Sequence, residues 1–202
     1  MIGRLHVLTD ARAGRDALHT ATLAIEAGAP VVQLRVKGAT DRELYDLGTR
    51  LVAVCARHAT TCLVNDRVDI ALAIGAHGTH LGADDLPVAA ARRIAGPDHI
   101  IGGTAREPVR AKQLVADGAS YLGVGPAYAT STKDGLPSPL GPDGIGAVAS
   151  AVAVPVIAIG GITASRVAEL RAAGAYGVAV VSEIAAATDP ADATRRLLEE
   201  LR

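Results

Sequence analysis

The sequence predicts an α/β fold made of one domain, a compact (β/α)8 or TIM barrel over residues 1–202, and three observations lead to it. First, the length suits one compact domain, and 50% of the residues are hydrophobic. Second, the chain has 22 glycines but no Phe or Trp. Ala, Val, Leu and Ile must therefore form the core, which favours helices packed closely on a sheet. Third, a Gly-Ala pair precedes a strand-like run four times.

Each Gly-Ala pair is interpreted as a helix end followed by a strand. Glycine is favoured just past a helix because it accepts a left-handed backbone, and the continuous apolar run after it is typical of a parallel strand covered on both faces. The pairs are Gly28-Ala29, Gly75-Ala76, Gly118-Ala119 and Gly174-Ala175. Together with the other apolar runs they predict eight strands, at residues 5–9, 31–35, 62–65, 78–81, 100–103, 121–125, 156–161 and 177–181. Helical patterns rich in Ala, Leu and Arg separate them, and a doubly wound open sheet is the alternative fold.

Composition disfavours several classes of partner. The chain has 20 Lys and Arg against 21 Asp and Glu, so no basic excess is available for nucleic acid or a lipid surface. Every apolar stretch is interrupted before about 18 residues, and the start of the chain has no signal-peptide pattern. We therefore expect a cytoplasmic protein that binds neither nucleic acid nor membrane. Cys55 and Cys62 are expected to be reduced core residues.

The carboxyl ends of the predicted strands carry the polar residues, and enzymes with this fold place their chemistry there. After the second strand, Gln33, Arg35 and Lys37 stand at alternating positions, which would send them to one face. A glutamine between two cations suits an anionic ligand, and a solvated strand end is the alternative.

Acidic residues follow the next two strands. Asn65 and Asp66 open one predicted helix, and Asp84 and Asp85 precede another, so each is also a candidate helix N-cap. Asp66 and Asp85 would come from neighbouring loops and would together suit one Mg²⁺, which takes one or two protein carboxylates along with water and phosphate oxygens.

The opposite side of the barrel has the features of a phosphate site. Gly160 and Gly161 follow the seventh strand, and a helix is expected to begin near Ser182, so backbone N–H groups would face a phosphate there. The alternative for these glycines is a tight turn. Residues 126–142 form a long loop with four prolines. This loop is expected either to close over bound phosphates or to be a flexible surface loop.

These features predict two anion sites in one barrel mouth, and two phosphorylated ligands in one mouth imply transfer between them. The order of residues predicts no catalytic triad. His6, His77 and His80 lie on or near predicted strands and are interpreted as packing or loop residues rather than bases.

Six motifs in order make the sequence resemble the thiamine phosphate synthase family over nearly its whole length. They are VLTD, VQLRVK, VNDRVDIALAIGAHGTHLGADDLP, GPAYATSTK, IAIGGI and GVAVVSEI. The resemblance implies a (β/α)8 enzyme that joins hydroxymethylpyrimidine diphosphate to hydroxyethylthiazole phosphate and releases pyrophosphate. It also implies a Mg²⁺ requirement and a dissociative substitution at the pyrimidine methylene. The oligomeric state is left open, and a homo-oligomer is one option.

The resemblance also assigns roles to residues of this sequence. It implies that Asp66 and Asp85 bind the metal and that Arg35, Lys37, Lys133 and Thr104 take part in catalysis. The residues expected to contact the substrates are Gln33, Arg35, Lys37, Asn65, Thr104, Thr130, Thr132, Lys133, Gly161, Val181 and Ser182. Three positions depart from the family pattern: Ala83 replaces a frequent glutamine, Thr104 a serine and Arg106 a histidine.

Two rival functions are alternatives to the synthase. One is a thiazole tautomerase of the same superfamily, which would need a base where this sequence has Arg106; arginine is a poor base because it stays protonated. The other is a barrel that binds phosphorylated ligands without catalysis. Formation of thiamine phosphate from the two substrates would distinguish the synthase from both, and ligand binding without turnover would favour the binding barrel.

Overall fold

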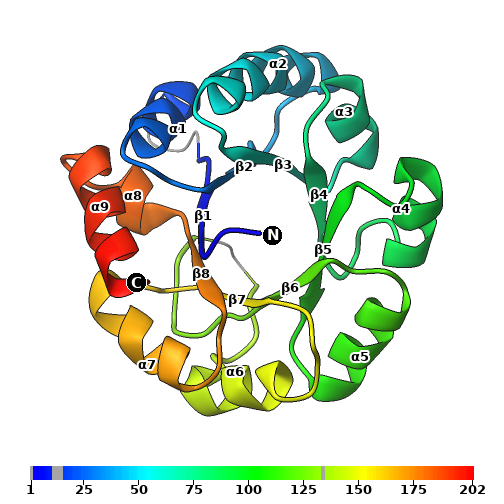
Figure 1. The fold of residues 1–202 in the computed structure, drawn as a ribbon, viewed down its shortest axis with the longest axis vertical. Helices are drawn as coiled ribbons and strands as arrows, with labels where there is room; N and C mark the ends of the chain where they lie inside the picture. The colour runs from blue at the N-terminus through cyan, green and yellow to red at the C-terminus, as the bar shows by residue number, and fades with distance from the viewer. Residues whose placement is uncertain (1, 11–15, 133–134) are drawn as a thin grey trace.

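The fold is a closed barrel of eight parallel strands, as predicted. A computed structural model describes residues 2–10, 16–132 and 135–202. The strands pair in chain order, and β8 pairs with β1, so the open-sheet alternative is wrong (Figure 1). The strands are β1 (Leu5–Leu8), β2 (Val31–Leu34), β3 (Thr61–Asn65), β4 (Gly78–Leu81), β5 (Ile100–Ala105), β6 (Tyr121–Val124), β7 (Val156–Ile159) and β8 (Gly177–Val180).

Helices form a ring around the barrel (Figure 1). They are α1 (Ala17–Glu26), α2 (Asp41–Arg57), α3 (Val68–Ala73), α4 (Val88–Ala95), α5 (Pro108–Ala116), α6 (Gly141–Ala149), α7 (Val167–Ala172) after a short 3₁₀ turn η2 (Ala164–Arg166), α8 (Ser182–Ala185) and α9 (Pro190–Glu200). The last helix, α9, packs against α1 and closes the ring. None of the helices in the described part of the chain has the length and apolar character needed to span a bilayer.

Local sequence signals explain where these helices begin and end. Thr40 starts α2 with a capping box, in which its hydroxyl accepts from the N–H of Glu43 and the Glu43 carboxylate accepts from the N–H of Thr40. The glycines of the four Gly-Ala pairs all have positive φ angles, which confirms that they end helices. At the first pair, the N–H of Ala29 bonds back to the carbonyl of Ala24 in α1, which satisfies one of the last helical carbonyls.

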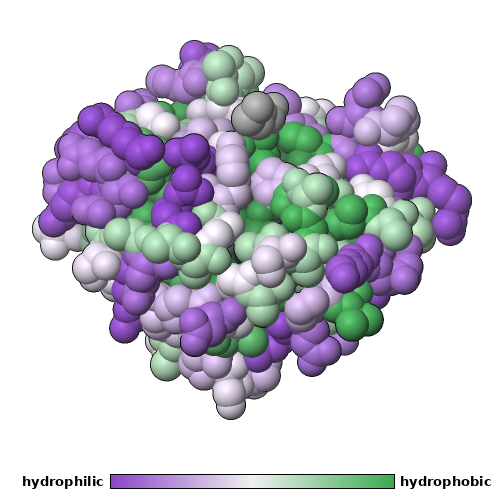
Figure 2. All heavy atoms as spheres, turned by 60° about the horizontal axis from the view of Figure 1, so that its bottom comes forward, coloured by the Kyte–Doolittle hydropathy of each residue, from purple (hydrophilic) through white to green (hydrophobic). Residues whose placement is uncertain are grey.

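Two layers of apolar side chains hold the fold together. The larger core lies between the barrel and the helices and consists mainly of Ala, Val, Leu and Ile, as composition predicted. Cys55 in α2 and Cys62 in β3 belong to it as fully buried free thiols, which confirms their predicted role. A smaller cluster from alternate strand positions includes Leu8, Leu63, Tyr121 and Ile157 inside the barrel. On the face drawn in Figure 2, hydrophilic side chains dominate the margin and hydrophobic ones appear between them.

The helix-cap alternative for the acidic residues is wrong. Helix α3 begins at Val68 with Arg67 at its N-cap position, and α4 has Pro87 there, with no side-chain capping bond in either case. Asp66 instead adopts a left-handed backbone with φ of 66°. Asp85 accepts a hydrogen bond from the N–H of Gly82 at 2.7 Å, within its own loop. Helix capping therefore does not explain why Asp66 and Asp85 stand at these positions.

Candidate active site

A cavity of about 500 Å³ occupies the barrel mouth at the carboxyl ends of the strands, a volume typical of small-molecule sites. All eight strands contribute lining residues, and every predicted site residue that the structure describes lines it. These are Gln33, Arg35, Lys37, Asn65, Asp66, Asp85, Thr104, Thr130, Thr132, Gly161, Val181 and Ser182. Lys133 lies outside the described residues. The barrel therefore brings residues that are far apart in the sequence to one site.

The β2 side of the cavity carries the basic residues. Gln33 is buried within the strand, while Arg35 and Lys37 follow it, because β2 ends one residue earlier than predicted. The backbone of Arg35 is held to β1 by Thr9, whose hydroxyl accepts from the N–H of Arg35 at 2.8 Å and donates to its carbonyl at 3.0 Å. This pair of bonds fixes the start of the Arg35 side chain. The sequence contained no signal for this contribution of Thr9.

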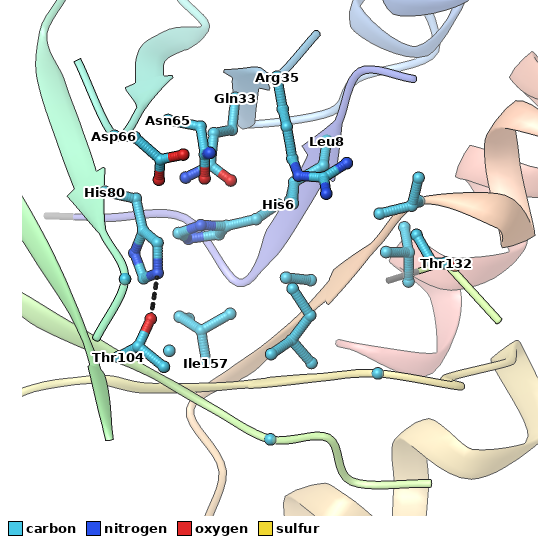
Figure 3. A pocket seen from close by; sticks show the side chains of 18 of the residues that line it. His6, Leu8, Gln33, Arg35, Asn65, Asp66, His80, Thr104, Thr132 and Ile157 are labelled. Atoms are coloured by element: carbon cyan, nitrogen blue, oxygen red, sulfur yellow. Dashed lines mark hydrogen bonds between the residues drawn. The ribbon is translucent and has the colours of Figure 1, made fainter. Parts of the chain in front are cut away.

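Asp66 and Asp85 line the same cavity from the loops after β3 and β4, and Figure 3 shows Asp66 directed into it beside Asn65. The left-handed backbone of Asp66 is held by a 2.8 Å hydrogen bond from its N–H to the carbonyl of His80. Within the described residues, no group of three or more His, Cys, Asp or Glu side chains is placed to hold a metal. Two carboxylates with free cavity volume beside them form a donor set that fits Mg²⁺, which keeps water and phosphate oxygens as its other ligands.

Arg67 connects the acidic loop to two helices. Its guanidinium pairs with Asp41 at the start of α2 and donates to Asp69 of α3 at 2.9 and 2.6 Å. These bonds lower the pKa of both carboxyl groups and raise the pKa of Arg67. Because both carboxylates are well exposed, the pairs add little stability. Their effect is geometric: they hold the backbone next to Asp66.

The predicted phosphate side is built on a glycine turn. Gly160 and Gly161 have φ angles of 100° and 63°, which residues with side chains rarely adopt. A Cβ atom on Gly161 would also collide with the carbonyl oxygen of Ala129. The turn is joined to the loop after β6 by a 3.0 Å hydrogen bond from the N–H of Tyr128 to the carbonyl of Gly160. The tight-turn interpretation is therefore correct, and the turn also lines the cavity beside Ser182, which begins α8.

Two threonines of the β6–α6 loop face this region. Thr132 donates through its N–H to the hydroxyl of Thr130 at 3.2 Å, and the two hydroxyls are 3.1 Å apart. Figure 3 places Thr132 across the cavity from Asp66 and His80. The site therefore has an acidic wall and a hydroxyl-bearing wall, with Arg35 between them.

The floor of the cavity contains polar residues that the sequence interpretation missed. His6 of β1, His80 of β4 and Tyr121 of β6 line the cavity, so the packing or loop assignment is incomplete for the two histidines. The packing or loop assignment is confirmed for His77, whose Nδ1 accepts a hydrogen bond from the N–H of Cys62 at 3.0 Å. The sequence did offer one signal for the cavity position of His6, His80 and Tyr121. Each has a polar ring within an otherwise mainly apolar strand.

Both floor histidines are neutral near pH 7. Burial lowers the pKa of His6 to about 3, assisted by the nearby His80, and burial lowers the pKa of His80 to about 4, against the opposing effect of the Asp85 charge. The Nε2–H of His6 donates to the carbonyl of Gly3 at 3.2 Å. The floor therefore offers neutral hydrogen-bonding groups, whereas the charged groups lie on the cavity walls.

Residues 5–184 match the model of the family described as Thiamine monophosphate synthase. The chain is 57% identical to the thiamine-phosphate synthase of Salinispora tropica, over 99% of this chain and 98% of that protein. It is 55% identical to the thiamine-phosphate synthase of Salinispora arenicola over the same shares. The chain belongs to the thiamine monophosphate synthase family.

A solved structure agrees with this assignment to the thiamine monophosphate synthase family. The thiamine phosphate pyrophosphorylase from Pyrococcus furiosus superposes with a TM-score of 0.90 at 34% identity, covering 98% of this chain and 95% of that one. The family resemblance seen in the six motifs is therefore confirmed over the full barrel.

Arg106, one of the departures from the family pattern, has a clear structural position. Its guanidinium donates to the carbonyl of Gly125 at 2.7 Å and to the carbonyl of Ser138 at 2.8 Å. It is not among the described residues that line the cavity. In this family member Arg106 thus ties the two ends of the β6–α6 loop together.

Proposed function

We propose that this chain is a thiamine-phosphate synthase, which joins hydroxymethylpyrimidine diphosphate to hydroxyethylthiazole phosphate and releases pyrophosphate. One observation carries the proposal: a single cavity in a member of this family is lined by cations, carboxylates, hydroxyls and a glycine turn that suit two phosphorylated ligands. Relatives that carry the synthase name match the chain over almost its full length.

Arg35, Lys37 and Lys133 would bind the diphosphate, Lys133 being assigned from the family motif alone. Asp66 and Asp85 would hold Mg²⁺, which would neutralise charge on the diphosphate oxygens when bound. The metal would be needed because a diphosphate beside two bare aspartates would be repelled. The cations on the neighbouring wall would stabilise the negative charge that accumulates as the carbon–oxygen bond breaks.

The remaining residues would position the two rings and the second phosphate. Gln33 and Asn65 would hydrogen-bond the pyrimidine edge, while Thr130, Thr132, Gly161 and Ser182 would receive the thiazole phosphate, with Val181 beside it. In a dissociative substitution the electron-rich pyrimidine stabilises the methylene cation, and the thiazole nitrogen captures it. This route needs no protein base, which agrees with the floor histidines His6 and His80, whose lowered pKa values of about 3 and about 4 make them weak proton acceptors. Holding both substrates together supplies the proximity effect.

The cytoplasm is the compartment in which we expect this reaction. Cys55 and Cys62 are free, buried thiols, and reduced cysteines are usual there.

The decisive experiment supplies the purified protein with both substrates and Mg²⁺ and detects thiamine phosphate and pyrophosphate by mass spectrometry. In parallel, the protein receives thiazole carboxylate phosphate alone. We expect product in the first assay and no tautomerisation in the second, since Arg106 is engaged by two carbonyl oxygens. Rapid tautomerisation without thiamine phosphate would favour the isomerase, and tight binding of both substrates without turnover would favour a binding protein.

A further inference from the structure

Three residues on adjacent strands form a hydrogen-bonded chain under the cavity. Nδ1 of His80 is 3.0 Å from the hydroxyl of Tyr121. Nε2 of His80 is 3.0 Å from the hydroxyl of Thr104, the hydrogen bond drawn in Figure 3. The strand register explains the contact: His80 of β4 pairs with Gly102 of β5, which pairs with Tyr121 of β6. A glycine between the two rings lets them meet across β5.

The space for this chain depends on two glycines. A Cβ atom on Gly102 would collide with the Tyr121 ring and with Nδ1 of His80. A Cβ atom on Gly123, the partner of Thr104 in the ladder, would lie 2.7 Å from Cε1 of His80. Any other residue at either position would displace the imidazole, so the backbone of β5 and β6 is built around it.

The direction of the hydrogen bonds follows from Tyr121. Its side chain is 1% exposed, and burial raises its pKa, so the hydroxyl keeps its proton. Within the described residues, the structure gives this hydroxyl one hydrogen-bond partner, Nδ1 of His80. If Nδ1 carried a proton and donated, the buried Tyr121 proton would lack an acceptor, which is costly. Tyr121 therefore donates to Nδ1, and the neutral imidazole carries its proton on Nε2.

We propose that Tyr121 and His80 are positioning residues that orient the Thr104 hydroxyl as a hydrogen-bond donor to the departing diphosphate. With Nε2–H donating to the Thr104 oxygen, the hydroxyl proton of Thr104 is directed away from His80 and into the cavity. This step rests on the proposed synthase function. No proton is transferred and no covalent bond changes in the protein; the chain polarises Thr104 and strengthens its bond to an oxygen whose negative charge is growing.

The first test reads the tautomer directly and does not depend on activity. The protein is labelled with ¹⁵N-histidine, and His80 is assigned by comparison with a His80→Gln variant. We expect the Nε2–H tautomer at pH 6–9 in the wild type and a mixture of tautomers in Tyr121→Phe. An Nδ1–H tautomer in the wild type would overturn the proposal even if the protein makes thiamine phosphate. Absence of thiamine phosphate with the expected tautomer would count against the synthase function instead.

The second test measures whether the effect of Tyr121 on turnover depends on the hydroxyl of Thr104. Tyr121→Phe keeps the buried ring and removes the donor, so we expect kcat to fall about tenfold with KM within about twofold. In a Thr104→Val background the same change should have almost no further effect, because the hydroxyl it orients is gone. Tyr176→Phe is the matched control, since the Tyr176 hydroxyl bonds the carbonyl of Ile2 at 3.1 Å, outside the site. An equal loss in both backgrounds would contradict the proposal.

Discussion

At the scale of single residues, the site depends on conformations that ordinary side chains avoid. Asp66 has a left-handed backbone, which costs about 1 kcal/mol or more for most residues and less for Asn or Asp. The bond from its N–H to the carbonyl of His80 and the clamp of Arg67 on Asp41 and Asp69 hold it there. The strained residue lines the cavity, as expected where a carboxylate must be aimed at a ligand.

Asp66→Asn should separate folding from function. Asparagine accepts the left-handed conformation, so we expect the free energy of unfolding to change by less than about 0.5 kcal/mol. Loss of the carboxylate should reduce Mg²⁺-dependent turnover about 100-fold or more. Urea unfolding and turnover as a function of Mg²⁺ concentration measure both effects. The exposed Asp98→Asn is the control. Near-normal turnover of Asp66→Asn at low Mg²⁺ would contradict the metal assignment.

His6 should make the protein sensitive to mild acid. Its pKa is lowered to about 3 in the folded state from 6.5, so below pH 6.5 the unfolded chain binds a proton that the folded protein does not. Ionisation of His6 therefore leaves the free energy of unfolding unchanged above pH 6.5 and lowers it as the pH falls towards 3, by up to about 1.4 kcal/mol per pH unit.

The measurement compares the unfolding free energy of wild type and His6→Gln between pH 7 and pH 4.5. The variant should show a shallower decline, with the exposed His58→Gln as control. Asp85 and the neighbouring His80 are present in both wild type and His6→Gln. To first order, their charges therefore cancel in the difference between the two unfolding free energies. Parallel curves would show that His6 does not carry this linkage.

At the scale of elements, distant contacts hold the described residues of the loop between β6 and α6. It supplies Thr130 and Thr132 to the cavity, and Arg106 from the end of β5 binds a carbonyl at each of its ends. The loop also bonds to the glycine turn after β7. Arg106, which replaces a residue typical of the family, is thus a structural anchor rather than a proton acceptor.

Arg106→Ala should loosen this loop. Removal of the guanidinium leaves the carbonyls of Gly125 and Ser138 without this donor, so we expect a loss of about 1–3 kcal/mol in stability and faster proteolysis within residues 126–140. Turnover should fall as well, because the threonines are no longer held in place. Limited proteolysis with mass spectrometry locates the cuts. Arg110→Ala, on the exposed face of α5, serves as control; equal cleavage rates in both variants would refute the anchoring role.

At the scale of the whole molecule, barrel closure gives the site its composition. The carboxyl ends of parallel strands meet at one rim, so acidic residues after β3 and β4 face hydroxyls and glycines after β6 and β7 across a single cavity. The closed barrel fixes groups of opposite charge around one cavity, so binding of the proposed ligands should stabilise the entire fold.

Removal of divalent ions should abolish turnover, and Mg²⁺ should restore it. Mg²⁺ with pyrophosphate at about 100 times its Kd should raise Tm by about 5–10 °C. Asp85→Asn should lose most of this shift, whereas Asp98→Asn should retain it. Differential scanning calorimetry with and without chelator measures it. An identical shift with pyrophosphate in the presence of chelator would exclude Asp66 and Asp85 as the metal site.

The sequence by itself determined the barrel and the set of candidate site residues that meet at the cavity walls. Gly-Ala helix ends, apolar strands and polar residues at strand ends are local signals, and parallel strands necessarily bring their carboxyl ends to one rim. That is why Arg35, Asp66 and Gly161 were identified before their distances were known. Their roles in substrate and metal binding remain predictions.

Only the tertiary structure decided how the residues of the cavity floor are arranged. His80, Thr104 and Tyr121 are separated by up to 41 residues in sequence, and the sequence predicts a site role for Thr104 alone. They become neighbours because the register places Gly102 between the two rings. The anchoring role of Arg106 and the left-handed backbone of Asp66 likewise arise from bonds to other strands and loops. Local sequence patterns do not encode such contacts, because they depend on the closure and register of the sheet.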